Sequence, residues 1–185
     1  GVVGINLGLF LNAQDEHEYS AVVAHELAHL SQRHFARGIE EQRANAIPNL
    51  AALIAAIMVG VVGGGEAGMA AISATQAIVQ QDQLRYSRAR ETEADRIGLS
   101  TLVRADLDPD GMARMFDRMN RAYRYTRKPP DFLLTHPLSE SRIADAKTQA
   151  RKYPRRDYPE SIDYALMRAR AQVHYAASES AAVKQ

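Results

Sequence analysis

The chain has 185 residues, which suits one domain that is long enough to bury a hydrophobic core. Hydrophobic residues make up 46% and charged residues 24%, which are ordinary values for a soluble globular protein. The net charge of +1 gives no reason to expect nucleic acid or a strongly acidic partner. The chain has no cysteine, which excludes disulfides, cysteine-ligated zinc and a thiol nucleophile.

The first residues alternate between apolar side chains and smaller or polar ones. Val3, Ile5, Leu7 and Leu9 recur with a period of two, which predicts a half-buried strand. Residues 1–11 open inside this run with neither an initiator methionine nor a signal peptide. We therefore expect a processed or trimmed piece of a longer protein.

A helix is predicted directly after this strand. Asp15 and Glu18 have the three-residue spacing of a capping box, which indicates where the helix begins. Its core face is formed by residues at helical spacing, namely Tyr19, Val22, Val23, Leu27 and Leu30. We expect this helix to reach about Gly38.

Residues 47–65 form the most apolar stretch of the chain. A membrane span needs roughly 20 apolar residues, and this run is barely that long, opens on Pro48 and ends in glycines. We therefore favour a buried or site-covering helix over a membrane-embedded one, with peripheral membrane contact as an open alternative. The run Gly63–Gly65 predicts a flexible turn.

The rest of the chain is predicted to be helical between loops that are marked by proline. Asp108 and Pro109 supply an N-cap and a proline at the first helical position. The expected helices cover about residues 70–104, 109–123, 139–153 and 162–177, with loops at 128–130 and 135–137. The predicted fold is therefore mainly α, of the α+β class, with a small sheet.

The sequence His25-Glu26-Leu27-Ala28-His29 is an HExxH motif inside the first predicted helix. The spacing puts the two imidazoles about 40° apart on one face, close enough to share one Zn²⁺. Glu26 lies one residue on, beside the metal, where a carboxylate takes a proton from water and passes it to a leaving amine.

A peptidase zinc site uses three protein ligands and one open position, so a third ligand is needed. The metzincin pattern would put a glycine three residues and a histidine six residues after His29. These places hold Gln32 and Phe35, which excludes that class. His34 is one position short and is predicted to be a surface histidine.

The alternative third ligand is a carboxylate from a second helix. Glu91 and Asp95 are four residues apart and share a face, whereas Glu93 is turned by about 160–200° from either. A ligand and a carboxylate that orients a histidine require such a same-face pair. We predict that Glu91 is the ligand, that Asp95 lies behind it, and that Glu93 faces solvent.

Several segments carry a resemblance to a known family. They are GVVGINLGL at 1–9, HELAH at 25–29, SQRHFARGIE at 31–40, YSR at 86–88, ETEAD at 91–95, Ile97-Gly98 and THPLSESR at 135–142. In these segments, which run over nearly the whole chain, the sequence resembles the HtpX and CAAX prenyl protease group of gluzincins. Within that group it resembles the periplasmic BepA-type (beta-barrel assembly-enhancing) proteases.

The resemblance implies roles for individual residues. His25, His29 and Glu91 would hold the zinc, with Glu26 as the catalytic carboxylate. Asp95 matches an aspartate beside the site, with an orienting or a proton-donating role. His136 matches a loop histidine that can occupy the fourth zinc position and keep the enzyme latent. Arg142 matches an arginine that would bind an oxyanion or the substrate carbonyl, or pair with an acidic neighbour, Glu140 or Asp145.

The resemblance also implies a function and a domain organisation. Residues 1–154 would form a peptidase domain without its N-terminal part, and residues 155–185 a linker and the start of a tetratricopeptide-repeat region. We expect a periplasmic zinc endopeptidase that degrades misfolded or stalled outer-membrane proteins beside the barrel-assembly machinery. The alternatives are a chaperone-like assembly factor with little proteolysis and a membrane-embedded enzyme of the prenyl protease type.

Overall fold

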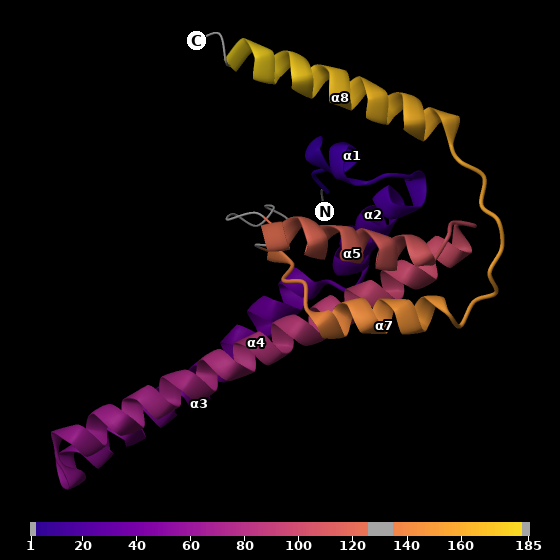
Figure 1. Cartoon of the computed structure of the whole chain (residues 1–185). Coiled ribbons are helices and arrows are strands. Elements are labelled where there is room, and N and C mark those ends of the chain that lie inside the picture. The colour runs from indigo at the N-terminus through magenta and orange to yellow at the C-terminus, as the bar shows by residue number, and fades with distance from the viewer. Residues whose placement is uncertain (1–2, 126–134, 183–185) are drawn as a thin grey trace. The chain divides into compact units, whose positions relative to one another are not determined.

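The computed structural model describes residues 3–125 and 135–182, with side chains described for 3–122 and 135–176. The described part is mainly helical, which confirms the predicted fold class, and it contains no strand of the expected small sheet. The helices are labelled in Figure 1. They are α1 (Gly8–Asn12), α2 (Glu16–Ser31), α3 (His34–Gly63), α4 (Gly65–Arg104), α5 (Asp110–Tyr125), α7 (Glu140–Ala150) and α8 (Ile162–Ala182).

The strand predicted over residues 3–9 is wrong, because the chain turns into α1 at Gly8. The Asn6 side-chain oxygen accepts a hydrogen bond from the Gly8 backbone N–H at 2.8 Å. Leu9 and Phe10 then both pack against the core. Adjacent strand residues point to opposite faces, so a short helix is the conformation that lets both neighbours reach one core.

Helix α2 begins where the capping residues predict. The Asp15 carboxylate accepts a hydrogen bond from the Glu18 backbone N–H at 2.8 Å, and the Glu18 carboxylate accepts one from the Gln14 N–H at 2.9 Å. The helix ends at Ser31 and not near Gly38, because Arg33 adopts a left-handed conformation with φ of 53° and α3 begins at His34.

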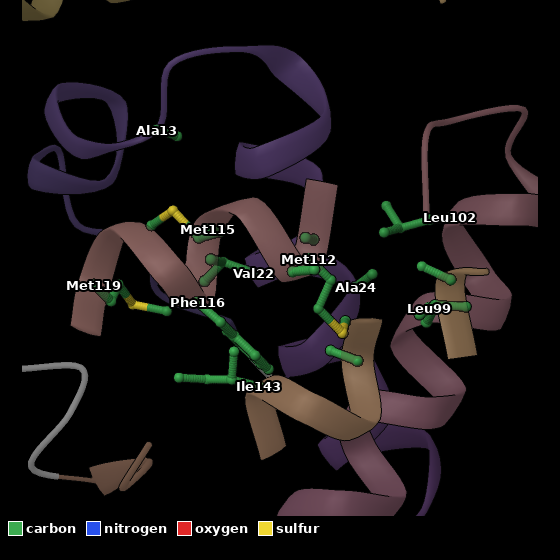
Figure 2. Close-up of a cluster of buried hydrophobic side chains, with 14 of the residues drawn as sticks. Ala13, Val22, Ala24, Leu99, Leu102, Met112, Met115, Phe116, Met119 and Ile143 are labelled. Carbon is green, nitrogen blue, oxygen red and sulfur yellow. The ribbon is translucent and has the colours of Figure 1, made fainter. Parts of the chain in front are cut away.

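The chain divides into two compact units, one of residues 1–28 and 93–185 and the other of residues 29–92. The first unit has a core of side chains from α2, the end of α4, α5 and α7 (Figure 2). Its most buried large members are Leu102 and Met112. The predicted N-cap Asp108 is observed, because its side chain accepts a hydrogen bond from the Asp110 N–H at 2.9 Å. Ser139, where the next helix was expected to begin, accepts one from the Arg142 N–H at 3.3 Å.

Helix α4 approaches α2 closely at one glycine of this unit. A Cβ on Gly98 would lie 3.1 Å from the His25 backbone nitrogen and 3.2 Å from the Ala24 carbonyl carbon. These distances are tighter than normal van der Waals contact, so a larger residue would force the two helices apart. The glycine thus lets α4 pass directly beside the part of α2 that carries the histidine motif.

The second unit is a helical hairpin of α3 and the first part of α4, joined by Gly64 with φ of 90°. Of the two alternatives predicted for residues 47–65, a buried or a site-covering helix, the buried one is wrong, because α3 buries only His34 and Ala56. Helix α3 is long and apolar enough to cross a membrane, by length and composition. Within this unit α4 packs against one side of α3, and many of the large apolar side chains of α3 are exposed.

Candidate metal centre

His25 projects from α2 into the first unit and is 1% exposed. Its two ring nitrogens have different neighbours. Nδ1 lies 2.9 Å from the Asp95 Oδ1 atom, and Nε2 lies 3.4 Å from the His136 Nδ1 atom. Asp95 therefore sits behind the imidazole, on the side away from His136, where a carboxylate fixes the tautomer and orientation of a ligand histidine.

Asp95 is itself held by Arg142. The guanidinium donates two hydrogen bonds to the carboxylate, from Nε to Oδ2 at 2.7 Å and from Nη2 to Oδ1 at 2.8 Å. Its Nη1 donates to the Pro137 carbonyl at 2.9 Å. Both side chains are buried, with Arg142 6% and Asp95 4% exposed. Such a bidentate pair is strong and fixes geometry, so Arg142 ties Asp95 to the segment that carries His136.

Asp145 is one of the two acidic neighbours that the sequence offered to Arg142. Its carboxylate instead accepts hydrogen bonds from Arg96 at 2.9 and 3.1 Å. That hydrogen bond lowers the pKa of Asp145 below its usual value. The alternative pairing proposed for Arg142 is therefore wrong for Asp145, because the buried Asp95 carboxylate presents two oxygens to the guanidinium.

His29 lies one turn after His25 on α2, and its contacts belong to the second unit. Its Nε2 lies 3.4 Å from the Glu91 Oε1 atom, and its Nδ1 lies 2.8 Å from the His34 Nδ1 atom. His34 is 4% exposed, so the prediction of a surface histidine is wrong. Each of the two histidines therefore has a carboxylate near one ring nitrogen and an imidazole near the other.

Four residues place one potential ligand atom each within 4.8 Å of one another: His25, His29, Glu91 and His136. The distance from His25 Nε2 to His136 Nδ1 is 3.4 Å, and so is the distance from His29 Nε2 to Glu91 Oε1. Nitrogen and oxygen ligands about 2.0–2.1 Å from a tetrahedral zinc ion lie about 3.3 Å apart. The donor types and these distances fit a zinc ion. Glu93 is not a member of the group.

Glu26 lies at the edge of this group and not within it. Its Oε1 atom is 3.4 Å from His136 Nε2, and its side chain is 29% exposed. His136 therefore stands between His25 and Glu26, with one ring nitrogen towards each. Its ring meets that of His25 edge-on, with centroids 5.1 Å apart.

Comparison with protein families gives this arrangement a context. The model of peptidase family M48 matches residues 1–150. The chain belongs to peptidase family M48. Membership in this metallopeptidase family implies a metal cofactor, and the cluster of histidines and a glutamate is the group in the described residues that could bind one.

Known relatives align with most of the chain. A Vibrio cholerae serotype O1 protein named as a beta-barrel assembly-enhancing protease is 46% identical over 176 residues, which are 95% of this chain and 36% of that protein. The beta-barrel assembly-enhancing protease of Escherichia coli strain K12 is 36% identical over 170 residues, 92% of this chain and 35% of that protein. The mitochondrial metalloendopeptidase OMA1 of Schizosaccharomyces pombe is 31% identical over 143 residues, 77% of this chain and 39% of that protein. The chain thus spans little more than a third of the length of these relatives.

Sequence reasoning missed one residue of this M48 site and one connection within it. The missed residue is His34, whose contact with His29 depends on the break between α2 and α3 at Arg33. The missed connection is the contact of Arg142 with Asp95, which joins residues 47 positions apart. The sequence does not show that Arg142 is buried, and it therefore gives no signal that this side chain needs a buried partner.

Proposed function

We propose that this M48 domain is a zinc-dependent endopeptidase of the gluzincin type. His25, His29 and Glu91 would hold one zinc ion, with Glu26 as the general base. The observation that carries the proposal is the cluster of ligand atoms within 4.8 Å of one another, with the Glu26 carboxylate beside it and outside the ligand group. When bound, zinc polarises the scissile carbonyl and lowers the pKa of a water molecule to about 7.

Three other side chains have roles in proton transfer and in positioning the ligands. Glu26 takes a proton from the attacking water and delivers it to the amine that leaves. Asp95 holds His25 through Nδ1, so that Nε2 faces the metal position. Arg142 gives its described hydrogen bonds to Asp95 and Pro137, so we assign it a positioning role and not that of an oxyanion ligand.

His34 would position the second ligand histidine. Replacing His34 with alanine should lower zinc affinity by about tenfold to a hundredfold, because loss of an outer hydrogen-bonding partner has this effect on metal sites. Competition with a colorimetric chelator measures it directly. His34→Gln, which keeps a polar side chain, should lose less. Equal zinc affinity in the parent and both variants, with only thermal stability lowered, would show that His34 merely fills space.

We further propose that the domain is latent as long as His136 stays in the site. Its Nδ1 atom faces His25 Nε2 and its Nε2 atom faces Glu26. In this position the imidazole would fill the fourth zinc position and also contact the general base. A peptide substrate would have to displace it. The hydrogen bond from Arg142 to the Pro137 carbonyl favours the closed position of this segment.

The names of the relatives suggest the biological setting. We infer that the substrates are proteins in outer-membrane assembly, above all misfolded or stalled outer-membrane proteins, and that the compartment is the bacterial periplasm. Residues 1–154 would form the peptidase domain, and residues 155–185 a linker and the start of a repeat region. Metal analysis together with casein digestion tests the enzymatic part of this proposal.

A chaperone-like assembly factor with little proteolysis is the second candidate. The position of His136 favours it, because a closed site leaves the protein free to bind without cleaving. A variant that retains zinc but lacks the general base separates the two candidates. A binding function would survive that change, whereas cleavage would be lost.

A further inference from the structure

In the α3–α4 hairpin, small residues lie between the two helices and large apolar residues of α3 lie on the outside. A water-soluble helix pair has its large apolar residues between the helices. Helix α3 meets α4 through small residues: Ala56 is buried, and a Cβ on Gly68 would lie 2.6 Å from the Gly60 Cα. Figure 1 shows the two helices side by side. Spacing of small residues by four is the pattern by which helices approach closely in lipid. The large apolar residues of α3 are therefore exposed on the outside of the hairpin.

These large residues cover three sides of α3. Relative to Gly60, Val59 and Val61 lie about 100° to either side, and Met58 and Val62 lie about 160° away, nearly opposite α4. They are strongly exposed, with Val61 74% and Val62 86% exposed. A protein partner that binds a helix in a groove uses one stripe of anchors. A lipid leaflet surrounds every side that α4 leaves open, so it fits this distribution better.

The charges of the hairpin also fit a membrane surface. Residues 44–81 contain a single charged residue, Glu66. The base of the hairpin, residues 33–43 and 82–90, contains six arginines and three carboxylates, a net charge of +3. One of these carboxylates, that of Glu41, forms an ion pair with Arg90 at 2.7 Å. Basic residues next to an apolar segment favour anionic headgroups.

The two helices differ in polarity, which would limit how deeply the hairpin inserts into a bilayer. Between Ala46 and Gly63, α3 has one charged or amide side chain, Asn49. Residues 65–81 of α4 carry Glu66 and three glutamines, Gln76, Gln80 and Gln81. Full insertion would bury these α4 side chains at a high cost. An amphipathic unit instead lies in the interface with its apolar face about 5–10 Å deep.

We propose that the α3–α4 hairpin binds one leaflet of an anionic phospholipid bilayer, with α3 in the outer hydrocarbon, α4 on its water side and the basal arginines at the headgroups. The proposal rests on the hairpin alone and does not require the peptidase activity. It assigns residues 47–63 as a membrane-binding element rather than as a cover of the site.

Fluorescence of single-tryptophan variants tests this proposal, since the chain has no tryptophan of its own. The probe is Val61→Trp, and the matched control is Leu166→Trp at an apolar residue of α8 that is also exposed. We expect vesicles of phosphatidylethanolamine and phosphatidylglycerol to shift the Val61→Trp emission to the blue, and brominated lipids to quench it. Leu166→Trp should show neither effect.

A paired change then separates insertion from adsorption by charge. Val59→Asp with Val62→Asp should lose most vesicle flotation, and its circular dichroism should match the parent because both residues are exposed. Flotation of this variant at the parent level would overturn the proposal, since the arginines alone would then hold the protein. Unchanged Val61→Trp emission with vesicles would also overturn it, as would self-association that buries this tryptophan without lipid.

Discussion

Replacing Glu26 with glutamine should abolish proteolysis and leave the zinc in place. General acid–base catalysis contributes about a hundredfold to ten-thousandfold, and a neutral amide cannot take a proton from water at neutral pH. Glu26 is outside the group of ligand atoms, so zinc content should stay at one ion per chain. The measurement is casein cleavage together with elemental analysis of the same samples.

This comparison is best made in a chain whose site is open. We would therefore place Glu26→Gln in the His136→Ala background, so that a closed site does not mask the loss. Glu16→Gln, at another carboxylate of α2, is the matched control and should keep full activity. Cleavage that persists in Glu26→Gln at the level of the control would remove Glu26 from the mechanism.

Replacing His136 with alanine should raise peptidase activity. If the closed site is open for about 1–10% of the time, removal of the closing side chain gives a gain of about tenfold to a hundredfold. The other three members of the ligand group remain, so zinc should be retained. Initial rates of peptide cleavage, measured at equal zinc occupancy, report the gain.

His174→Ala provides the control for this change, because His174 is an exposed histidine on α8. It should leave the rate unchanged. Equal rates in His136→Ala and the parent would contradict latency. Loss of both zinc and activity would instead identify His136 as a permanent ligand of the metal.

The sequence predicts those parts of the fold that local interactions determine. Asp15, Asp108 and Ser139 mark helix starts because each cap is a hydrogen bond to a backbone N–H two or three residues on. The strand expected over residues 3–9 failed because the pattern does not show that Leu9 and Phe10 share a core. The exposure of α3 depends on how few helices pack around it, which no local pattern reports.

In the site, too, the sequence predicts the contacts that local spacing determines and misses those that depend on the path of the chain. The pairs His25 with His29 and Glu91 with Asp95 follow from helical spacing alone. His34 does not, because in a continuous helix it would lie about 140° from His29. The left-handed residue Arg33 resets the direction of the chain, and His34 comes to lie 2.8 Å from His29.

The identity of the third ligand is the central claim, and zinc content tests it most directly. The parent and Glu93→Gln should each bind one zinc ion per chain after dialysis, because Glu93 lies outside the ligand group. Glu91→Gln should lose most of its zinc under the same conditions. Retention of zinc by Glu91→Gln, with its loss from Glu93→Gln, would contradict the account.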